Sequence, residues 1–352
     1  MPEVQSSPAF LAIAGSLDCF GILSNVLMLC YLFCNRVGSK LTTDLMKNQL
    51  AFDGLTSVFA LCSLFVPDDL FTSLDSLGGL FCRLWVSRTI FWFLVLLSET
   101  NLVCIAVDRI RAVAFSSTYK QRGKITLTFY YSFIFSYSVI FAIPFVFTVK
   151  YDGSQCQHLM ASVSNSSSNI YSTVQAYLWL FTGYLIPGLV MTGCYIHIVV
   201  LMRKFILKKL GNLRKSPTLS QNNSYVSTSV PSTLSSFSRS FIVTAITMWS
   251  AFLITHAYYT IYTILCTHGA VKFMSDSVQR RVGIFATVIN STLNPLIMVV
   301  SSPPFRRGLW KFLRSCHGTT TVANASDASS IKRDSQNCIP PANRNDSPAT
   351  AQ

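Results

Sequence analysis

The sequence is poor in charged residues, and in acidic residues above all. Only 12% of its residues are charged, and Asp and Glu number 14 against 28 Lys and Arg, which gives a formal net charge of +14. An ordinary soluble domain carries about 25% charged residues. Since hydrophobic residues make up 51% of the chain, the composition indicates that much of the surface faces lipid rather than water.

Several other features are missing. No nucleophile, base and orienting group occur at a recognisable spacing, which argues against an enzyme. The first residues lack the basic start and small-residue cleavage site of a secretory signal, so we expect the first hydrophobic segment to direct insertion. The 11 cysteines are an odd number, and most stand inside apolar runs. They therefore look like small buried residues, with neither a metal site nor a disulfide lattice.

Long apolar runs dominate what is present. A helix needs about 20 apolar residues to cross the hydrocarbon core of a bilayer. The sequence therefore predicts an all-α membrane protein, a seven-transmembrane helix bundle. Its spans are expected near 10–33, 45–66, 84–107, 125–149, 174–202, 241–266 and 282–300.

The basic residues gather in alternate breaks between these runs. This asymmetry places the first such break in the cytoplasm and the N-terminus outside the cell, and it explains the positive charge without a nucleic-acid partner. We expect a multi-pass protein of the plasma membrane, with its C-terminus in the cytoplasm. The basic groups are Arg36, Lys40 and Lys47; Arg111, Lys120, Arg122 and Lys124; Arg203, Lys204, Lys208, Lys209, Arg214 and Lys215; and Arg306, Arg307, Lys311 and Arg314.

These patterns divide the chain into four parts. Residues 1–9 form an extracellular N-terminus, and residues 10–303 form the transmembrane domain, with a disordered cytoplasmic loop at 204–237. Residues 304–316 alternate apolar and basic side chains at helical spacing, which predicts a short amphipathic helix on the inner leaflet. Residues 317–352 form a disordered tail, a candidate for phosphorylation and arrestin binding. Asn165 is the one believable glycosylation site.

Polar residues recur at mid-depth in four of the predicted spans. Each has an ordinary interpretation, because Asn and Ser often join membrane helices by hydrogen bonds. Together they predict a hydrated cluster around Asp53 that could hold a monovalent cation, a structural Na⁺, through oxygen ligands. No other cofactor is expected. The residues are Asn25, Asp53, Ser98, Glu99, Asn290, Ser291 and Asn294.

Six short motifs in order along the chain carry a family resemblance. They are Gly21-x-x-x-Asn25-Val26, Asn48-Gln49-Leu50-Ala51-Phe52-Asp53, Asp108-Arg109-Ile110, Pro187 with Tyr195, Asn294-Pro295-Leu296-Ile297-Met298, and Phe305-Arg306 at the start of the amphipathic helix. The set resembles the rhodopsin-like (class A) G-protein-coupled receptors. The Asn-Gln-x-x-x-Asp and Cys-Arg-Leu-Trp segments are most similar to invertebrate orphan receptors related to neuropeptide receptors.

The resemblance implies a ligand-operated switch. An agonist among the outer halves of the helices would favour a state in which the sixth helix swings outward and exposes a crevice for a heterotrimeric G-protein. Asp108, Arg109, Tyr195, Asn294 and Pro295 would form the switch and the coupling site. The resemblance also implies a disulfide between Cys82 and Cys156, and Cys316 is a palmitoylation candidate.

Departures from the family pattern concern the switch. Ile110 and Met298 replace tyrosines, and the fourth helix lacks its usual Trp. The sixth helix has no Pro, and its best alignment puts Trp249 in the usual Phe position and Leu253 in that of the toggle Trp. No acidic residue stands near Ser235 to lock the third helix to the sixth. Cys82 also lies two residues further from Arg109 than is usual.

The outer half of the bundle offers aromatic and cationic side chains. These suit a peptide, or alternatively a carboxylate-bearing small molecule, although aromatic belts at membrane interfaces need no ligand at all. Phe91 stands where amine receptors carry a carboxylate, and Val288 where opsins carry the retinal-binding Lys. A non-signalling receptor-like protein and, less favoured, a transporter stay as alternatives. The pocket candidates are Arg88, Phe91, Trp92, His256, Tyr259 and Arg281.

Overall fold

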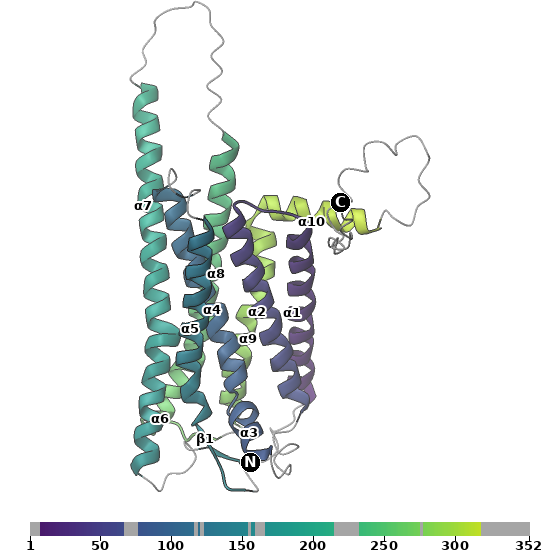
Figure 1. Cartoon of the computed structure of the whole chain (residues 1–352), viewed down its shortest axis with the longest axis vertical. Helices are drawn as coiled ribbons and strands as arrows, with labels where there is room; N and C mark the ends of the chain where they lie inside the picture. Colours follow the sequence, from purple (N-terminus) through teal and green to yellow (C-terminus); the bar gives the residue numbers. More distant parts are fainter. Residues whose placement is uncertain are drawn as a thin grey trace, which may run out of the picture.

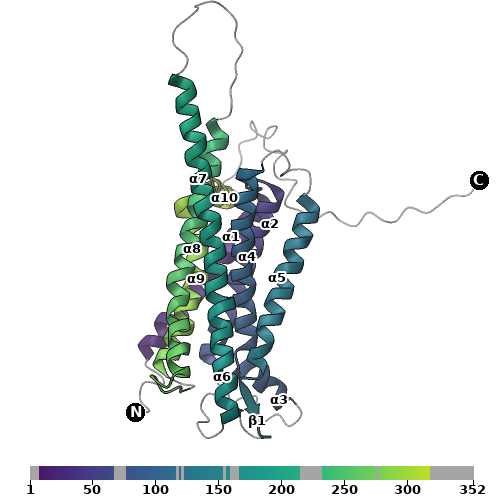
Figure 2. The ribbon, with the colours of Figure 1, turned by 90° about the vertical axis from the view of Figure 1, so that its left-hand side faces the viewer.

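The protein is a bundle of long helices that run side by side (Figures 1 and 2). A computed structural model describes residues 8–66, 77–115, 119, 123–153, 156–158, 166–214, 232–274 and 277–317. The helices are α1 (Pro8–Cys34), α2 (Lys40–Phe65), α3 (Gly78–Phe81), α4 (Thr89–Ala114), α5 (Gly123–Val146), α6 (Ser166–Trp179), α7 (Ile186–Arg214), α8 (Ser232–Thr267), α9 (Val278–Ser301) and α10 (Pro303–His317). Two π-helical turns join these elements, η1 (Cys82–Val86) before α4 and η3 (Leu180–Leu185) between α6 and α7.

Six of these helical stretches are long and apolar enough to cross a membrane by length and composition. The seventh long helix, α2, has 26 residues, but Gln49, Asp53 and Ser57 lower its hydropathy. All three side chains are fully buried inside the bundle, while large apolar side chains such as Ile125 and Ile254 are 73% and 75% exposed. This inverted distribution is what a lipid solvent requires. The predicted seven-transmembrane helix bundle is therefore confirmed.

Helix α10 lies across the long axis of the bundle, at the end opposite strand β1 (Val149–Tyr151) (Figure 1). Phe305 and Phe312 pack against Tyr31 of α1, with ring centroids 6.3 and 6.0 Å apart. Arg306 and Lys311 face away and are exposed. The helix is thus amphipathic, with its apolar side on the bundle and its basic side available to anionic headgroups.

Helices α7 and α8 extend beyond the rest of the bundle at the α10 end (Figure 1). Because α7 continues to Arg214 and α8 begins at Ser232, much of the loop expected to be disordered over 204–237 is helical. Residues 215–231 lie outside the described residues, as do 1–7, 318–352 and Asn165. Cys316 lies in the last turn of α10.

At the opposite end, a disulfide joins Cys82 to Cys156, as the resemblance implied, with a Cα–Cα distance of 5.7 Å. We call this the disulfide end, and the other the Arg109 end. Cys156 begins strand β2 (Cys156–His158), which pairs antiparallel with β1 (Val149–Tyr151). The two extra residues between Cys82 and Arg109 are accommodated by the wide turn η1 and by Arg88, whose φ of 60° breaks the helix before α4.

Gly21 permits the close packing of α1, α2 and α9. A Cβ at this position would lie 2.6 Å from Thr292 Oγ1 and 2.8 Å from Ser57 Oγ, whereas a Cβ at Gly193 would meet nothing within 4 Å. Gly21→Ala is therefore expected to destabilise the bundle by about 1–3 kcal/mol through overpacking. The measurement is thermal unfolding of the purified protein in detergent, with Gly193→Ala as the matched control. Equal melting temperatures for the two variants would contradict this packing.

Candidate functional site

A network of polar side chains surrounds Asp53 in the middle of the bundle. Its carboxylate accepts from Ser98 Oγ at 2.7 Å, Asn294 Nδ2 at 2.7 Å and Gln49 Nε2 at 3.0 Å. Asn101 of α4 donates in turn to Gln49 Oε1 at 2.8 Å. Side chains of α2, α4 and α9 thus meet at the carboxylate of Asp53. Gln49 is a member of this network that the sequence reading did not select.

Four further oxygens in or near this network lack a donor among the described residues. They are Oδ1 of Asn25, Asn101, Asn290 and Asn294, all buried. Asn25 is held in place by its amide, which donates to Gly21 O and to Ser291 O at 3.1 Å. Buried oxygens without donors next to a carboxylate are the ligand type that a hard cation takes. These residues therefore fit a monovalent cation, and they also fit ordered water.

At the Arg109 end, Asp108 is the centre of a second polar cluster, here called the Asp108 cluster. Its carboxylate accepts from Arg109 Nη2, from Tyr119 Oη at 2.8 Å and from Thr42 Oγ1 at 3.2 Å. Burial and the neighbouring Asp108 carboxylate raise the pKa of Tyr119, so its hydroxyl keeps the proton that it donates. Arg109 also donates to Thr42, and its side chain is 11% exposed. The arrangement holds the Arg109 guanidinium against Asp108 and against Thr42 of α2.

Helix α8 is tied to α9 at this end by hydroxyl groups. Thr244 Oγ1 lies 2.7 Å from Ser301 Oγ, and Ser240 Oγ donates to Ser301 O at 3.3 Å. Tyr195 of α7 is buried with its ring 6.1 Å from that of Trp249. Neutral hydroxyl pairs are weaker than an ion pair in a dry interior. Among the side chains that the structure describes, α8 is therefore held at this end without a charged lock.

The inward face of α8 differs from the alignment expected from sequence. Phe252 and His256, one turn apart, are buried in the bundle, while Leu253 is only partly buried. The Leu253 carbonyl accepts from Tyr184 of η3 at 3.1 Å. The side chains at the centre of the bundle are therefore Phe252 and His256, in place of Trp249 and Leu253.

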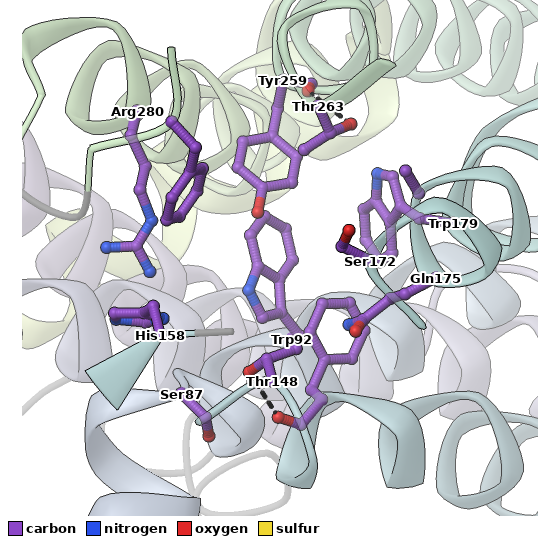
Figure 3. A pocket seen from close by; sticks show the side chains of 13 residues that line it. Ser87, Trp92, Thr148, His158, Ser172, Gln175, Trp179, Tyr259, Thr263 and Arg280 are labelled. Carbon is purple, nitrogen blue, oxygen red and sulfur yellow. Dashed lines mark hydrogen bonds between the residues drawn. The ribbon is translucent and has the colours of Figure 1, made fainter. Parts of the chain in front are cut away.

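A cavity of about 60 Å³ opens among aromatic side chains at the disulfide end (Figure 3), and we call it the aromatic cavity. Trp92 is central to it, with ring centroids 4.4 Å from Tyr259, 4.7 Å from Trp179 and 5.6 Å from Phe145. Its lining is Ser87, Trp92, Phe145, Thr148, His158, Ser172, Gln175, Ala176, Trp179, Tyr259, Thr263, Phe273 and Arg280. In this state it has room for a few water molecules or one small group.

The charged side chain of the aromatic cavity lies on one side of it. Arg280 and His158 lie on one side of Trp92, with Ser172 and Gln175 on the other (Figure 3). Burial, together with the guanidinium groups of Arg280 and Arg88, lowers the pKa of His158 to about 3. The imidazole is therefore neutral at physiological pH and able to hydrogen-bond. No Asp or Glu stands among the described lining residues, so a cationic edge borders an aromatic floor.

The pocket residues selected from sequence fall into two groups. Trp92 and Tyr259 line the aromatic cavity, and Phe91 is buried behind Trp92 with ring centroids 5.0 Å apart. Arg88, Arg281 and His256 do not line it, and Arg280 takes the place expected of Arg281. His158, Ser172 and Gln175 were not selected. A signal for His158 was present, because it follows Cys156 by two residues and the disulfide draws that strand over the bundle.

Comparison with known proteins agrees with this architecture. The family model described as 7 transmembrane receptor (rhodopsin family) matches residues 24–298, more than half of the 352-residue chain. The chain therefore belongs to the rhodopsin family of seven-transmembrane receptors. No curated protein gives a significant match.

Proposed function

We propose that this receptor transmits the binding of an extracellular ligand, a peptide, to a heterotrimeric G-protein. Family membership supports a signalling receptor. The observation that carries the rest is the placement of two sites at opposite ends of one bundle: the aromatic cavity at the disulfide end, and the Asp108 cluster at the other. In this proposal the disulfide end is extracellular, and Arg109 is released toward the G-protein when the active state forms.

The ligand, in this proposal, presents an aromatic or apolar group to Trp92 and an anionic group to Arg280. The guanidinium has the shape and charge to bind a carboxylate through two hydrogen bonds. An acidic side chain or free C-terminus of a peptide meets this need. The small volume of the aromatic cavity and its cationic edge also favour the second candidate, a carboxylate-bearing small molecule.

The ligand proposal is tested with cells that express the chain together with a panel of G-protein biosensors. The probes are synthetic peptides with free or amidated C-termini and a set of aromatic and aliphatic carboxylates. Arg280→Gln is expected to lower the potency of an active probe about 30-fold or more, since removing one member of a desolvated charge pair costs several kcal/mol. Arg281→Gln, outside the cavity lining, is the matched control and should change potency less than about twofold. Equal potency at all three receptors would overturn the proposed anion contact.

We also propose that the oxygens around Asp53 hold a Na⁺ ion in the resting state. A ligand that binds only the folded protein stabilises it by mass action. Raising NaCl at constant ionic strength, with choline as the replaced cation, should therefore raise the melting temperature of the wild type but not that of Asp53→Asn. A melting temperature that rises equally in both proteins would show that the effect does not come from this site.

A further inference from the structure

A carboxyl group and an imidazole meet between the aromatic cavity and the Asp53 network. Glu99 Oε1 of α4 lies 3.1 Å from His256 Nε2 of α8, and both side chains are 2% exposed. Two helical turns separate Glu99 from Trp92, and about one turn separates His256 from Tyr259, so the pair lies beneath the aromatic floor. On the other side, Ser98, the neighbour of Glu99, donates to Asp53.

The neighbours of the imidazole show which of its nitrogen atoms carries hydrogen. Nδ1 lies 3.1 Å from the backbone oxygen of Phe252, which can only accept a hydrogen bond. It also lies 3.1 Å from Thr255 Oγ1, but that hydroxyl donates to Ala251 O at the shorter distance of 2.8 Å. Nδ1 must therefore be the donor. A neutral ring protonated at Nδ1 presents a bare Nε2 to Glu99.

A bare nitrogen atom facing a carboxylate is repulsive, so the short contact between Nε2 and Oε1 needs one more proton. It is supplied either by a protonated Glu99, which donates to Nε2, or by a doubly protonated ring beside a carboxylate. Both forms are electrically neutral as a pair. The cost of a buried charge also indicates that the pair holds this additional proton. The ring of His256 is the only ion-pair or hydrogen-bond partner of the Glu99 carboxyl group among the described residues. A net negative charge at this depth would cost several kcal/mol.

Two tyrosine hydroxyl groups of the described residues near the pair already donate elsewhere. Tyr137 of α5 is within electrostatic reach of Glu99, but its hydroxyl donates to Thr182 O at 2.8 Å. Tyr184 donates to the Leu253 carbonyl. We therefore propose that Glu99 and His256 form a buried proton-binding site that joins α4 to α8. The single bound proton closes this link, and the link restrains α8 in the resting state.

The consequence for switching follows from where α8 is held. Its contacts with α9 at the Arg109 end are hydroxyl pairs, whereas the Glu99–His256 contact joins it to α4 at the centre of the bundle. A ligand that enlarges the aromatic cavity by displacing Trp92 or Tyr259 acts on residues one or two turns from the pair. The functional part of this inference rests on the proposed signalling function, but the proton-binding part does not.

The proton is tested by nitrogen-15 NMR of the purified protein labelled at its five histidines. The His256 signals are assigned by elimination, with single variants of His158, His197, His268 and His317. The expected result is a protonated Nδ1, with Nε2 either hydrogen-bonded to a carboxylic acid or protonated as well. An imine-type Nδ1 with a protonated Nε2 would overturn the proposal, since the ring would then donate its own Nε2 proton to Glu99 and the contact would need no additional proton.

The link is tested by basal nucleotide exchange on purified G-protein in membranes with equal receptor amounts. Glu99→Leu, which leaves Nε2 without a donor, is expected to raise basal exchange about fivefold or more. Glu99→Gln, whose amide donates to Nε2, should restore exchange to within about twofold of the wild type. Ile254→Ala, on the lipid-facing side of α8, is the control for a change in the same helix. If Glu99→Leu does not fold, the double variant Glu99→Leu/His256→Phe, which replaces the pair by apolar groups, takes its place with the same expected rise.

Exchange by the apolar variants that equals the wild type would overturn the link. The failure of the proposed function would look different, because neither the wild type nor any variant would then exceed Arg109→Ala. In that case the NMR result alone would still decide whether the proton is bound.

Discussion

Replacing Arg109 by Ala is expected to lower receptor-dependent nucleotide exchange on a G-protein at least tenfold, without loss of protein from the cell surface. Arg109 is held by Asp108 and Thr42 in the resting structure. Its guanidinium is the group that an active state would present to the G-protein, and a charged contact of this kind is worth 2 kcal/mol or more when desolvated, which is about a factor of 30. The measurement is exchange in membranes with surface expression matched by an N-terminal tag.

Arg111→Ala is the matched control for this prediction. Arg111 lies on the next half-turn of α4, and its side chain donates a hydrogen bond to Tyr130 Oη at 3.4 Å. It should keep most of the activity. If both variants kept full exchange, the Asp108 cluster would be structural, and the coupling role given to Arg109 would have to be abandoned.

Breaking the disulfide is expected to have the second large effect. Cys82→Ser or Cys156→Ser frees strand β2, which carries His158 at the cationic edge of the aromatic cavity. The crosslink spans a sequence separation of 74 residues, and loss of a native disulfide costs about 2–5 kcal/mol in small secreted domains. We expect a melting temperature lower by several degrees and a potency for active probes reduced at least tenfold.

Cys62→Ser provides the comparison, because Cys62 is exposed on α2 and forms no disulfide. Its melting temperature and its probe response should match those of the wild type. A disulfide variant that kept both properties would show that β2 holds its place without the crosslink, through its pairing with β1.

Much of the architecture could be predicted from the sequence, because a segment that crosses the bilayer core must be apolar and must satisfy its own backbone hydrogen bonds. Apolar runs long enough to span a bilayer leave few alternatives, and the polar residues Asp53 and Ser98 were recognisable as inward-facing. Helix ends were harder to predict. The Ser-rich start of α8 is polar enough to resemble a loop, yet α8 begins at Ser232. A polar composition indicates only that a segment is exposed to water. A helix that projects beyond the bundle is exposed to water as a loop is.

The residues that the sequence did not predict are those whose place in a site depends on how the helices pack in three dimensions. Between Met248 and His256, the sequence offers Trp249, Phe252 and His256 as residues that could face the centre of the bundle. Only the rotation of α8 relative to α4 determines that Phe252 and His256 face inward. Arg280 and Arg281 are adjacent in sequence, so no pattern shows which one enters the aromatic cavity. Gln49 lies one turn before Asp53 on the same helix, so helical spacing could have shown this pairing. Its contacts with Ser98 and Asn101, by contrast, depend on the packing of α2 against α4.

The orientation of the bundle in the membrane tests the central claim most directly, because the ligand site and the G-protein site must face opposite compartments. The measurement combines glycosylation at Asn165 with antibody access to a tag inserted within residues 215–231 of intact and permeabilised cells. We predict a glycan on Asn165 that is lost in Asn165→Gln, and a tag detected only after permeabilisation. A tag accessible on intact cells, with Asn165 unmodified, would place Arg109 outside the cell and contradict the account.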